Sequence, residues 1–219
     1  MLRVLLYPLT LMYRLVCRLG IVDVACLMHL PQSGCKKVAC PEGYTVRSVT
    51  QEELEDLLKT KRVNRQVGKA KLLADKRRAL VAVFHEDKVV SFMWMAKQAI
   101  DSKNNYSRSV HLGTSIDLPD GTGFIYNAWT SPKHRGKRLV GVMCSWAVRN
   151  RVVGAWACLM MADWTNKKSV RAFHYVGMRH LGYVIRIGRG PLQISLVPNA
   201  AQRIGLRVAD HAPGMKMAW

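Results

Sequence analysis

The sequence predicts an α+β protein in which helices flank a mixed central sheet and an apolar helical arm precedes the sheet. Three observations predict this class. With 219 residues and 49% apolar content, the chain can bury one good core. Short segments with the two-residue period of strands are interspersed with segments of helical period. In chain order they give βααβββαβαββ, with room for one extra strand, so we expect a single domain with additions at both ends.

The first thirty residues form the predicted arm. On a helix, Arg3, Thr10, Arg14 and Arg18 fall at spacings of seven, four and four, beside a wide apolar arc. The uncharged runs are shorter than the about 20 residues of a spanning helix, and no signal-peptide cleavage site is present. An apolar arc edged by arginine suits the surface of an anionic membrane. Packing on the body of the protein, or on a second subunit in a homodimer, explains the same pattern equally well.

We divide the chain into residues 1–40 as the arm and a polar linker, residues 41–198 as the sheet domain, and residues 199–219 as a C-terminal tail. The domain begins at a polar stretch with proline and glycine, which is followed by an alternating first strand. Thr50 and Glu53 form a capping box, which predicts a helix through about residue 58.

The next segment, residues 59–78, is strongly basic, with nine Lys or Arg and one acid. Val63, Val67, Ala70 and Ala74 lie at helical spacing, so the segment predicts a second helix. Such a basic helix either walls a pocket for an acidic acceptor or presents a solvated charged face.

The remaining elements follow from periodicity. We expect hairpins at 79–85 with 89–98 and at 109–116 with 122–130, helices at 139–153 and 166–176, and strands at 155–162, 183–187 and 192–197.

The most informative stretch is the turn Pro132-Lys-His-Arg-Gly-Lys-Arg-Leu-Val-Gly141, between a predicted strand and a predicted helix. A cationic turn that contains glycine and opens a helix presents free backbone N–H groups and the positive end of the helix dipole. These groups favour a polyphosphate, so the turn predicts a phosphate-bearing cofactor.

This turn and a second motif thirty residues later make the chain resemble the GNAT superfamily of acyl-CoA-dependent N-acyltransferases, over about residues 44–197. Arg135 and Gly136 fit the family's pyrophosphate turn, whereas Arg138 and Val140 stand where the family has Gly and Gly or Ala. In the second motif Asn166, Ser169 and Gly177 fit in register. The resemblance implies acetyl-CoA or another acyl-CoA as co-substrate, held by Thr130, Arg135, Gly136, Lys137, Arg138, Leu139, Val140, Asn166 and Ser169.

The resemblance also implies that an amine attacks the thioester directly, without a covalent enzyme intermediate. The position of the family's tyrosine acid is Phe173 here, which has no proton to give. We expect Tyr126, on the facing strand, to replace it, with Tyr175 as a second candidate. Asp163 is the candidate base, although an acid before a helix is often a cap or a partner of arginine. No metal site is predicted.

Charge indicates the kind of partner. Lys and Arg (34) minus Asp and Glu (14) gives +20, so we expect an anionic partner. The predicted function is transfer of an acyl group to an amine of an acidic acceptor, either a small molecule or a glycoconjugate such as an amino-sugar or envelope conjugate. Two alternatives stay open: a nucleic-acid-binding or nucleic-acid-modifying protein on the same fold, and a non-catalytic membrane-associated scaffold. Six cysteines without metal or disulfide spacing favour the cytoplasm, with peripheral association at the inner face of the membrane.

Overall fold

The computed structural model describes residues 2–19, 21–188, 192–208 and 215–218. Its strands are β1 (Val22–Leu30), β2 (Thr45–Val49), β3 (Arg78–His85), β4 (Lys88–Lys97), β5 (Ala99–Ile100), β6 (Ile116–Asp117), β7 (Thr122–Thr130), β8 (Ala157–Asp163), β9 (Arg179–Ile187), β10 (Ile194–Val197), β11 (Arg207–Val208) and β12 (Met215–Ala218). Its α-helices are α1 (Leu2–Arg18), α2 (Gln51–Lys59), α3 (Leu139–Arg149), α4 (Lys167–Tyr175) and α5 (Asn199–Arg203).

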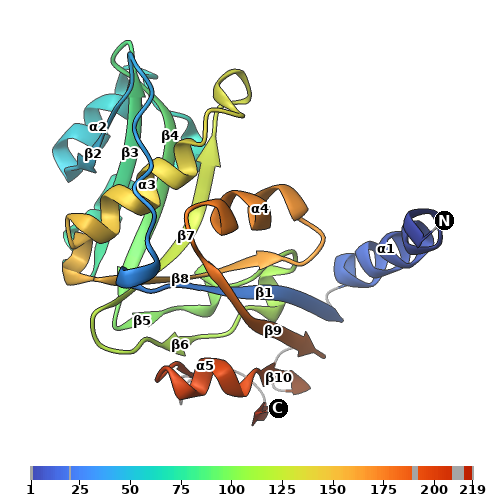
Figure 1. Cartoon of the computed structure of the whole chain (residues 1–219). Helices are drawn as coiled ribbons and strands as arrows, with labels where there is room; N and C mark the ends of the chain where they lie inside the picture. Colours follow the sequence, from blue (N-terminus) through green and yellow to red (C-terminus); the bar gives the residue numbers. More distant parts are fainter. Residues whose placement is uncertain (1, 20, 189–191, 209–214, 219) are drawn as a thin grey trace.

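Among the described residues, nine strands form one mixed sheet in the order β12-β10-β9-β1-β8-β7-β4-β3-β2. The β7/β8 and β10/β12 pairs are parallel, and the other pairs are antiparallel. Strands β11, β6 and β5 form a small second sheet. Helices α3 and α4 cover one face of the large sheet (Figure 1). The predicted α+β class with flanking helices is confirmed.

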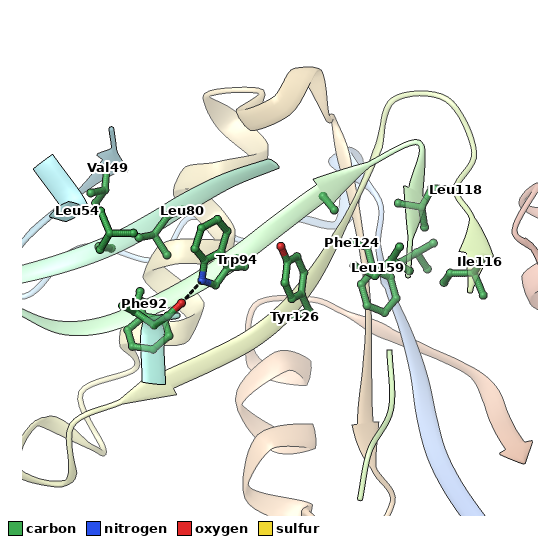
Figure 2. Packing of buried hydrophobic residues seen from close by; sticks show 14 of the residues in the cluster. Val49, Leu54, Leu80, Phe92, Trp94, Ile116, Leu118, Phe124, Tyr126 and Leu159 are labelled. Carbon is green, nitrogen blue, oxygen red and sulfur yellow. Dashed lines mark hydrogen bonds between the residues drawn. The ribbon is translucent and has the colours of Figure 1, made fainter. Parts of the chain in front are cut away.

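The two faces of the sheet bury separate apolar clusters because side chains alternate along each strand. One cluster joins α2 to the sheet through Leu54, Leu80 and Trp94. Figure 2 shows this cluster, in which the Trp94 indole donates to the Val67 carbonyl at 2.7 Å. The other cluster lies beneath α3 and α4 and includes Phe173. The sheet is therefore covered on both faces.

The first strand differs from the sequence prediction. Residues 22–30 were assigned to the arm, but they form β1, which lies in the sheet between β8 and β9. Leu27, Met28 and Leu30 are fully buried. A strand buried on both faces reads as a continuous apolar run, which sequence periodicity does not distinguish from a helix. The assignment of residues 1–40 to an arm and linker is thus wrong for 22–30.

The helical part of the arm is α1, which extends outward at the end of the sheet where β1 begins (Figure 1). The structure exposes several of its large apolar side chains: Leu9, Leu11, Met12 and Leu15. None of the helices in the described residues has the length and hydropathy of a membrane-spanning segment.

Three further predictions need correction. In the basic segment 59–78, the residues between α2 and β3 contain the 3₁₀ turns η2 (Arg65–Val67) and η3 (Ala70–Ala74) instead of a second α-helix, and Gly68 takes a φ of +93° between the two turns. Residues 109–116 contain the turn η5 (Val110–Leu112) and only the start of β6. The tail contributes α5, β11 and β12, and β12 extends the large sheet. The Thr50 cap is confirmed, since its hydroxyl accepts from the Glu53 N–H at 3.2 Å.

Candidate active site

The sheet opens between two parallel strands, β7 and β8. Their pairing runs only from Thr122 with Ala157 to Ile125 with Met160, although β7 continues to Thr130 and β8 to Asp163. The ends of the two strands therefore separate and form a wedge. Its β7 wall lacks a β8 partner along residues 126–130, so backbone groups there can pair with an extended, amide-bearing ligand.

A local distortion of β7 accompanies the wedge. The register of β4 with β7 shifts between Phe92 and Trp94, and Asn127 takes a φ of +46°. The Asn127 side-chain amide donates to the Gln66 carbonyl at 2.9 Å. An irregularity of this kind bends a strand away from its neighbour, which is the geometry that the wedge requires.

The cationic turn closes one end of the wedge. After β7, the turn η6 (Pro132–His134) leads to Gly136, with a φ of +83°, and to Arg138, the N-cap of α3. In the described part of the chain, the backbone N–H groups of residues 136–141 donate to no other backbone group outside the helix ladder. A Cβ added at Gly136 would have no atom within 4 Å. The turn is therefore an open cradle of N–H donors, which suits a phosphate.

The side chains of the turn add positive charge to this cradle. Lys133, Arg135, Lys137 and Arg138 are all exposed. None of them pairs with a carboxylate among the residues that the structure describes. The first turn of α3 also carries no acid that would neutralise the helix dipole. These residues fit the diphosphate of a nucleotide-containing cofactor.

Arg138 stands where the GNAT pattern, which the sequence resembles, has glycine. It takes the left-handed conformation, with φ of 60° and ψ of 22°, which favours glycine. Its guanidinium lies over the Tyr175 ring at 4.2 Å from the centroid and donates to the Tyr175 hydroxyl. The structure thus brings Tyr175, a predicted catalytic residue, to the cationic turn.

The start of α4 follows the end of β8, which is one wall of the wedge. The Asn166 side chain accepts from the Ser169 N–H at 3.2 Å and so caps the helix. Phe173 is only 3% exposed and belongs to the core beneath α3 and α4. Phe173 is therefore a packing residue.

Tyr126 lies where β7 leaves β8, directly after the last paired residue, on the opposite face from Phe173. It is 8% exposed, and its hydroxyl accepts from the Arg78 guanidinium at 3.1 Å. Figure 2 shows its ring beside Trp94, with the centroids 6.2 Å apart. Burial raises the pKa of Tyr126, and the neighbouring Arg78 opposes that shift. Since Arg78 occupies a lone pair and not the proton, the phenol can donate.

Asp163 ends β8 and forms the opposite wall of the wedge. Its carboxylate accepts from the guanidinium of Arg108 and from the backbone N–H of Thr165, the latter at 2.7 Å. The Thr165 hydroxyl also donates to it. Because the carboxylate is already occupied by the Arg108 guanidinium and the two Thr165 donors, the geometry favours a structural role over that of a base.

Two site residues were missed at the sequence level. Arg78 contacts Tyr126, and Arg108 contacts Asp163, across 48 and 55 residues of chain. Neither belongs to a local motif. The basic character of residues 59–78 was the only sequence signal for Arg78.

The sequence matches no protein-family model and no curated protein. Among solved structures, it is similar to a GCN5-related N-acetyltransferase from Kribbella flavida, at 14% identity and a TM-score of 0.49, over 78% of this chain and 62% of that chain. A GCN5-related N-acetyltransferase-like protein from Streptococcus suis has 13% identity and a TM-score of 0.42, over 74% of this chain and 61% of the other. The chain thus spans about three fifths of the length of these two proteins.

A smaller similar structure is the ribosomal-protein-alanine N-acetyltransferase from Brucella melitensis biovar Abortus, with 10% identity and a TM-score of 0.40. The alignment covers 62% of this chain and 92% of that one. The chain is thus similar to solved GNAT N-acetyltransferases, with between 62% and 78% of its own length aligned to the three described here.

Proposed function

We propose that the protein is an acyl-CoA-dependent N-acyltransferase that acylates an amine of an acidic acceptor, such as an amino-sugar or envelope conjugate. One observation carries the proposal: the β7/β8 wedge leads directly into an exposed cradle of N–H groups and cations. A wedge that pairs with an amide-bearing arm and a cradle that binds a diphosphate are the two sites that coenzyme A requires.

Different residues at the wedge would bind different parts of the co-substrate. Gly136 and the N-terminal N–H groups of α3 would hold the diphosphate, with Arg135 and Lys137 as cationic partners. Residues 126–130 of β7 would pair with the amide-bearing arm. Asn166 and Ser169 would border the same arm at the start of α4.

Acyl-CoA supplies the thioester whose carbonyl carbon the amine attacks. The chain must hold the amine near this carbon and provide a proton for the thiolate that leaves. We assign the proton to the Tyr126 hydroxyl, because Tyr126 is the first residue of β7 beyond its pairing with β8 and because Arg78 leaves the phenol proton free. Asp163 holds Arg108, and water removes the proton from the amine.

The proposal includes binding of α1 to a membrane surface. The outer face of α1 exposes Leu11 and Leu15 at 57% and 59%, and Leu19, directly after the helix, is 61% exposed. With Arg14 and Arg18 on the same helix, this face suits an anionic membrane surface, which would place the protein at the cytoplasmic side of the membrane. A second copy of the chain is the competing occupant.

Calorimetry with acetyl-CoA tests the co-substrate. We compare the wild type, a turn variant (R135Q/K137Q) and a control variant (R149Q/R203Q). The control removes two exposed cations away from the turn. We expect the turn variant to bind acetyl-CoA about tenfold more weakly and the control to bind like the wild type. Absence of binding heat with acetyl-CoA and with free coenzyme A, in protein shown to be folded, would refute the proposal.

A further inference from the structure

One face of α1 is attached to the end of the sheet. The Tyr13 hydroxyl accepts from the Val24 N–H at 3.0 Å and lies 3.3 Å from the Val24 carbonyl oxygen. The Tyr13 ring meets Trp164 edge-on, with the centroids 5.3 Å apart. Cys17, one turn later, is 2% exposed. These contacts hold α1 against the start of β1 and the end of β8.

A cavity of about 650 Å³ lies between α1 and the segment that joins β5 to β6. We call it the arginine pocket, and it is lined by Arg14, Cys17, Arg18, Ser107 and Arg108. Its volume is in the range of small-molecule sites. Burial raises the pKa of the Cys17 thiol, so this thiol lines the pocket as a neutral group.

The segment that joins β5 to β6 is held in place by Asp23 of β1. The backbone N–H groups of Ser107 and Arg108 donate to the Asp23 carboxylate at 3.2 and 3.0 Å. Asp23 also accepts from Arg186 at 2.8 Å, and both side chains of this ion pair are fully buried. The Arg108 backbone is thus anchored to the sheet, and the pocket has a preformed wall.

The pocket carries an excess of positive charge. Arg108 pairs with Asp163, but Arg14 and Arg18 pair with no carboxylate in the described residues. Three guanidinium groups minus one carboxylate leave two positive charges. A phosphate monoester carries about −1.5 to −2 at neutral pH and accepts the paired N–H donors of arginine. The charge of the pocket therefore matches a phosphate monoester.

The arginine pocket adjoins the wedge at Arg108. Arg108 lines the pocket and donates to Asp163, the last residue of β8 and one wall of the wedge. An acceptor that lies across Arg108 can therefore keep an anionic group beside α1 while its amine points toward the thioester.

We propose that the arginine pocket binds a phosphate monoester on the acceptor, so that the acceptor is a phosphorylated amine and α1 is a wall of its binding site. This inference rests on the proposed function and names its substrate class. The phosphate can come from a soluble amine or from the head group of a lipid, because α1 also presents an apolar outer face.

The first test is calorimetry of O-phosphoethanolamine with the full chain saturated with coenzyme A, which occupies the cationic turn. The pocket variant is R14Q/R18Q, and the control is R149Q/R203Q, which loses the same charge. We expect the pocket variant to bind about tenfold more weakly than the control. Ethanolamine, which lacks the phosphate, should not bind. Equal affinities of the pocket variant and the control overturn the inference.

A parallel titration with acetyl-CoA separates this inference from the proposed function. The pocket variant should bind acetyl-CoA like the wild type, because Arg14 and Arg18 do not line the turn. If neither the wild type nor the variants bind acetyl-CoA, the proposed function fails. The O-phosphoethanolamine titration is then made with the Arg14 and Arg18 substitutions introduced into the R135Q/K137Q variant. Dependence on Arg14 and Arg18 there still supports the pocket as a phosphate site.

Vesicle flotation distinguishes the two sources of the phosphate. Phosphatidylcholine vesicles are prepared with phosphatidic acid, which carries a phosphate monoester, or with phosphatidylglycerol, which is anionic but carries only a phosphodiester. A lipid acceptor predicts that the pocket variant loses more flotation on phosphatidic acid than on phosphatidylglycerol and that O-phosphoethanolamine releases the wild type from phosphatidic acid. A soluble acceptor predicts calorimetric binding, with the pocket variant losing equal flotation on the two anionic lipids. Failure of both readouts overturns the inference.

Discussion

The guanidinium of Arg138 lies over the ring of Tyr175, with its central carbon 4.2 Å from the ring centroid, while the Arg138 backbone takes a φ of +60°. The side-chain contact is favourable, and the backbone conformation is not, because a left-handed residue other than glycine costs about 1 kcal/mol. Arg138 is therefore held at the start of α3 against its own backbone preference.

We predict that R138G is more stable than R138A by about 1 kcal/mol. Both variants lose the contact with Tyr175, so their difference isolates the backbone. Urea denaturation measures it. Arg171, inside α4, gives the matched control with the opposite sign: R171G should be less stable than R171A by about 1 kcal/mol, because glycine is unfavourable in a helix. The same sign at both positions would contradict the assigned conformation.

The local structure of the candidate site was predictable where its signals lie close together in the sequence. Pro132 and Gly136 follow a strand pattern directly, and Asn166 precedes a helix pattern, so the turn and the start of α4 were read from adjacent residues. By contrast, β1 lies beside β8 and β9, whose residues are more than 120 positions away. A run of apolar residues without such a partner reads as part of the arm.

Ion pairs between residues far apart in the sequence explain why other residues of the candidate site were not predicted. The Arg186 guanidinium bonds to Asp23 across 163 residues of chain, and Arg108 bonds to Asp163 across 55. Nothing in the local sequence distinguishes these arginines from the other basic residues of a chain with a net charge of +20. Only the folded sheet brings them to carboxylates and so builds the arginine pocket.

The buried Arg186–Asp23 pair yields a second prediction. Both side chains are 0% exposed, and burial lowers the pKa of Arg186 while Asp23 opposes that shift. D23N leaves the guanidinium charge uncompensated in the core, so we expect a loss of about 3–5 kcal/mol. R47Q breaks an exposed pair with Glu53 and should cost about 1 kcal/mol or less. Urea denaturation compares the two, and similar losses would show that the buried charge is solvated.

The third prediction concerns acid. The pKa of His29 is lowered by burial and then by Arg179, and the pKa of His180 is lowered by burial and then by His174. Histidine in the unfolded chain has a pKa of about 6.5. Below this pH, the unfolded chain binds protons at His29 and His180 more readily than the folded chain does. The stability that the two histidines contribute is therefore fully present above about pH 6.5 and is lost as the pH falls below that value.

Thermal unfolding at several values between about pH 5 and pH 7 measures this loss. We expect the melting temperature to fall with pH in the wild type and to fall less steeply in H29Q. The control is H111Q, which changes an exposed histidine and should keep the wild-type slope. A slope in H29Q equal to that of H111Q would contradict the prediction for His29.

The fourth prediction concerns the proton for the leaving thiolate. Y126F removes the hydroxyl and keeps the ring beside Trp94. With O-phosphoethanolamine and acetyl-CoA, we expect the rate of thiol release to fall by about 100-fold, because a positioned acid contributes at least this factor. The affinity for acetyl-CoA should not change. Y175F serves as the comparison: it should alter acetyl-CoA binding more than the rate at saturation, since Tyr175 contacts Arg138 at the cationic turn.

The last prediction concerns the outer face of α1. Leu11 and Leu15 lie on one side of α1, and Leu19 follows at the same interval of four residues directly after the helix, where its N–H donates to the Leu15 carbonyl at 3.2 Å. Each of the three is more than half exposed. Exposed leucines contribute little to folding, so L11Q/L15Q/L19Q should unfold at nearly the wild-type urea concentration. On phosphatidylglycerol vesicles, the loss of three apolar anchors should lower the partition coefficient by about tenfold or more.

The control for the α1 variant is L192Q, because Leu192 is 83% exposed and lies outside α1. It should float like the wild type. Size-exclusion chromatography over a concentration series tests the competing occupant, a second copy of the chain. A wild type that elutes as a dimer and a triple variant that elutes as a monomer, with equal flotation of both, would assign this face to self-association. Loss of flotation with an unchanged elution volume assigns it to the membrane, since an apolar face edged by arginine then has only the anionic bilayer to cover it.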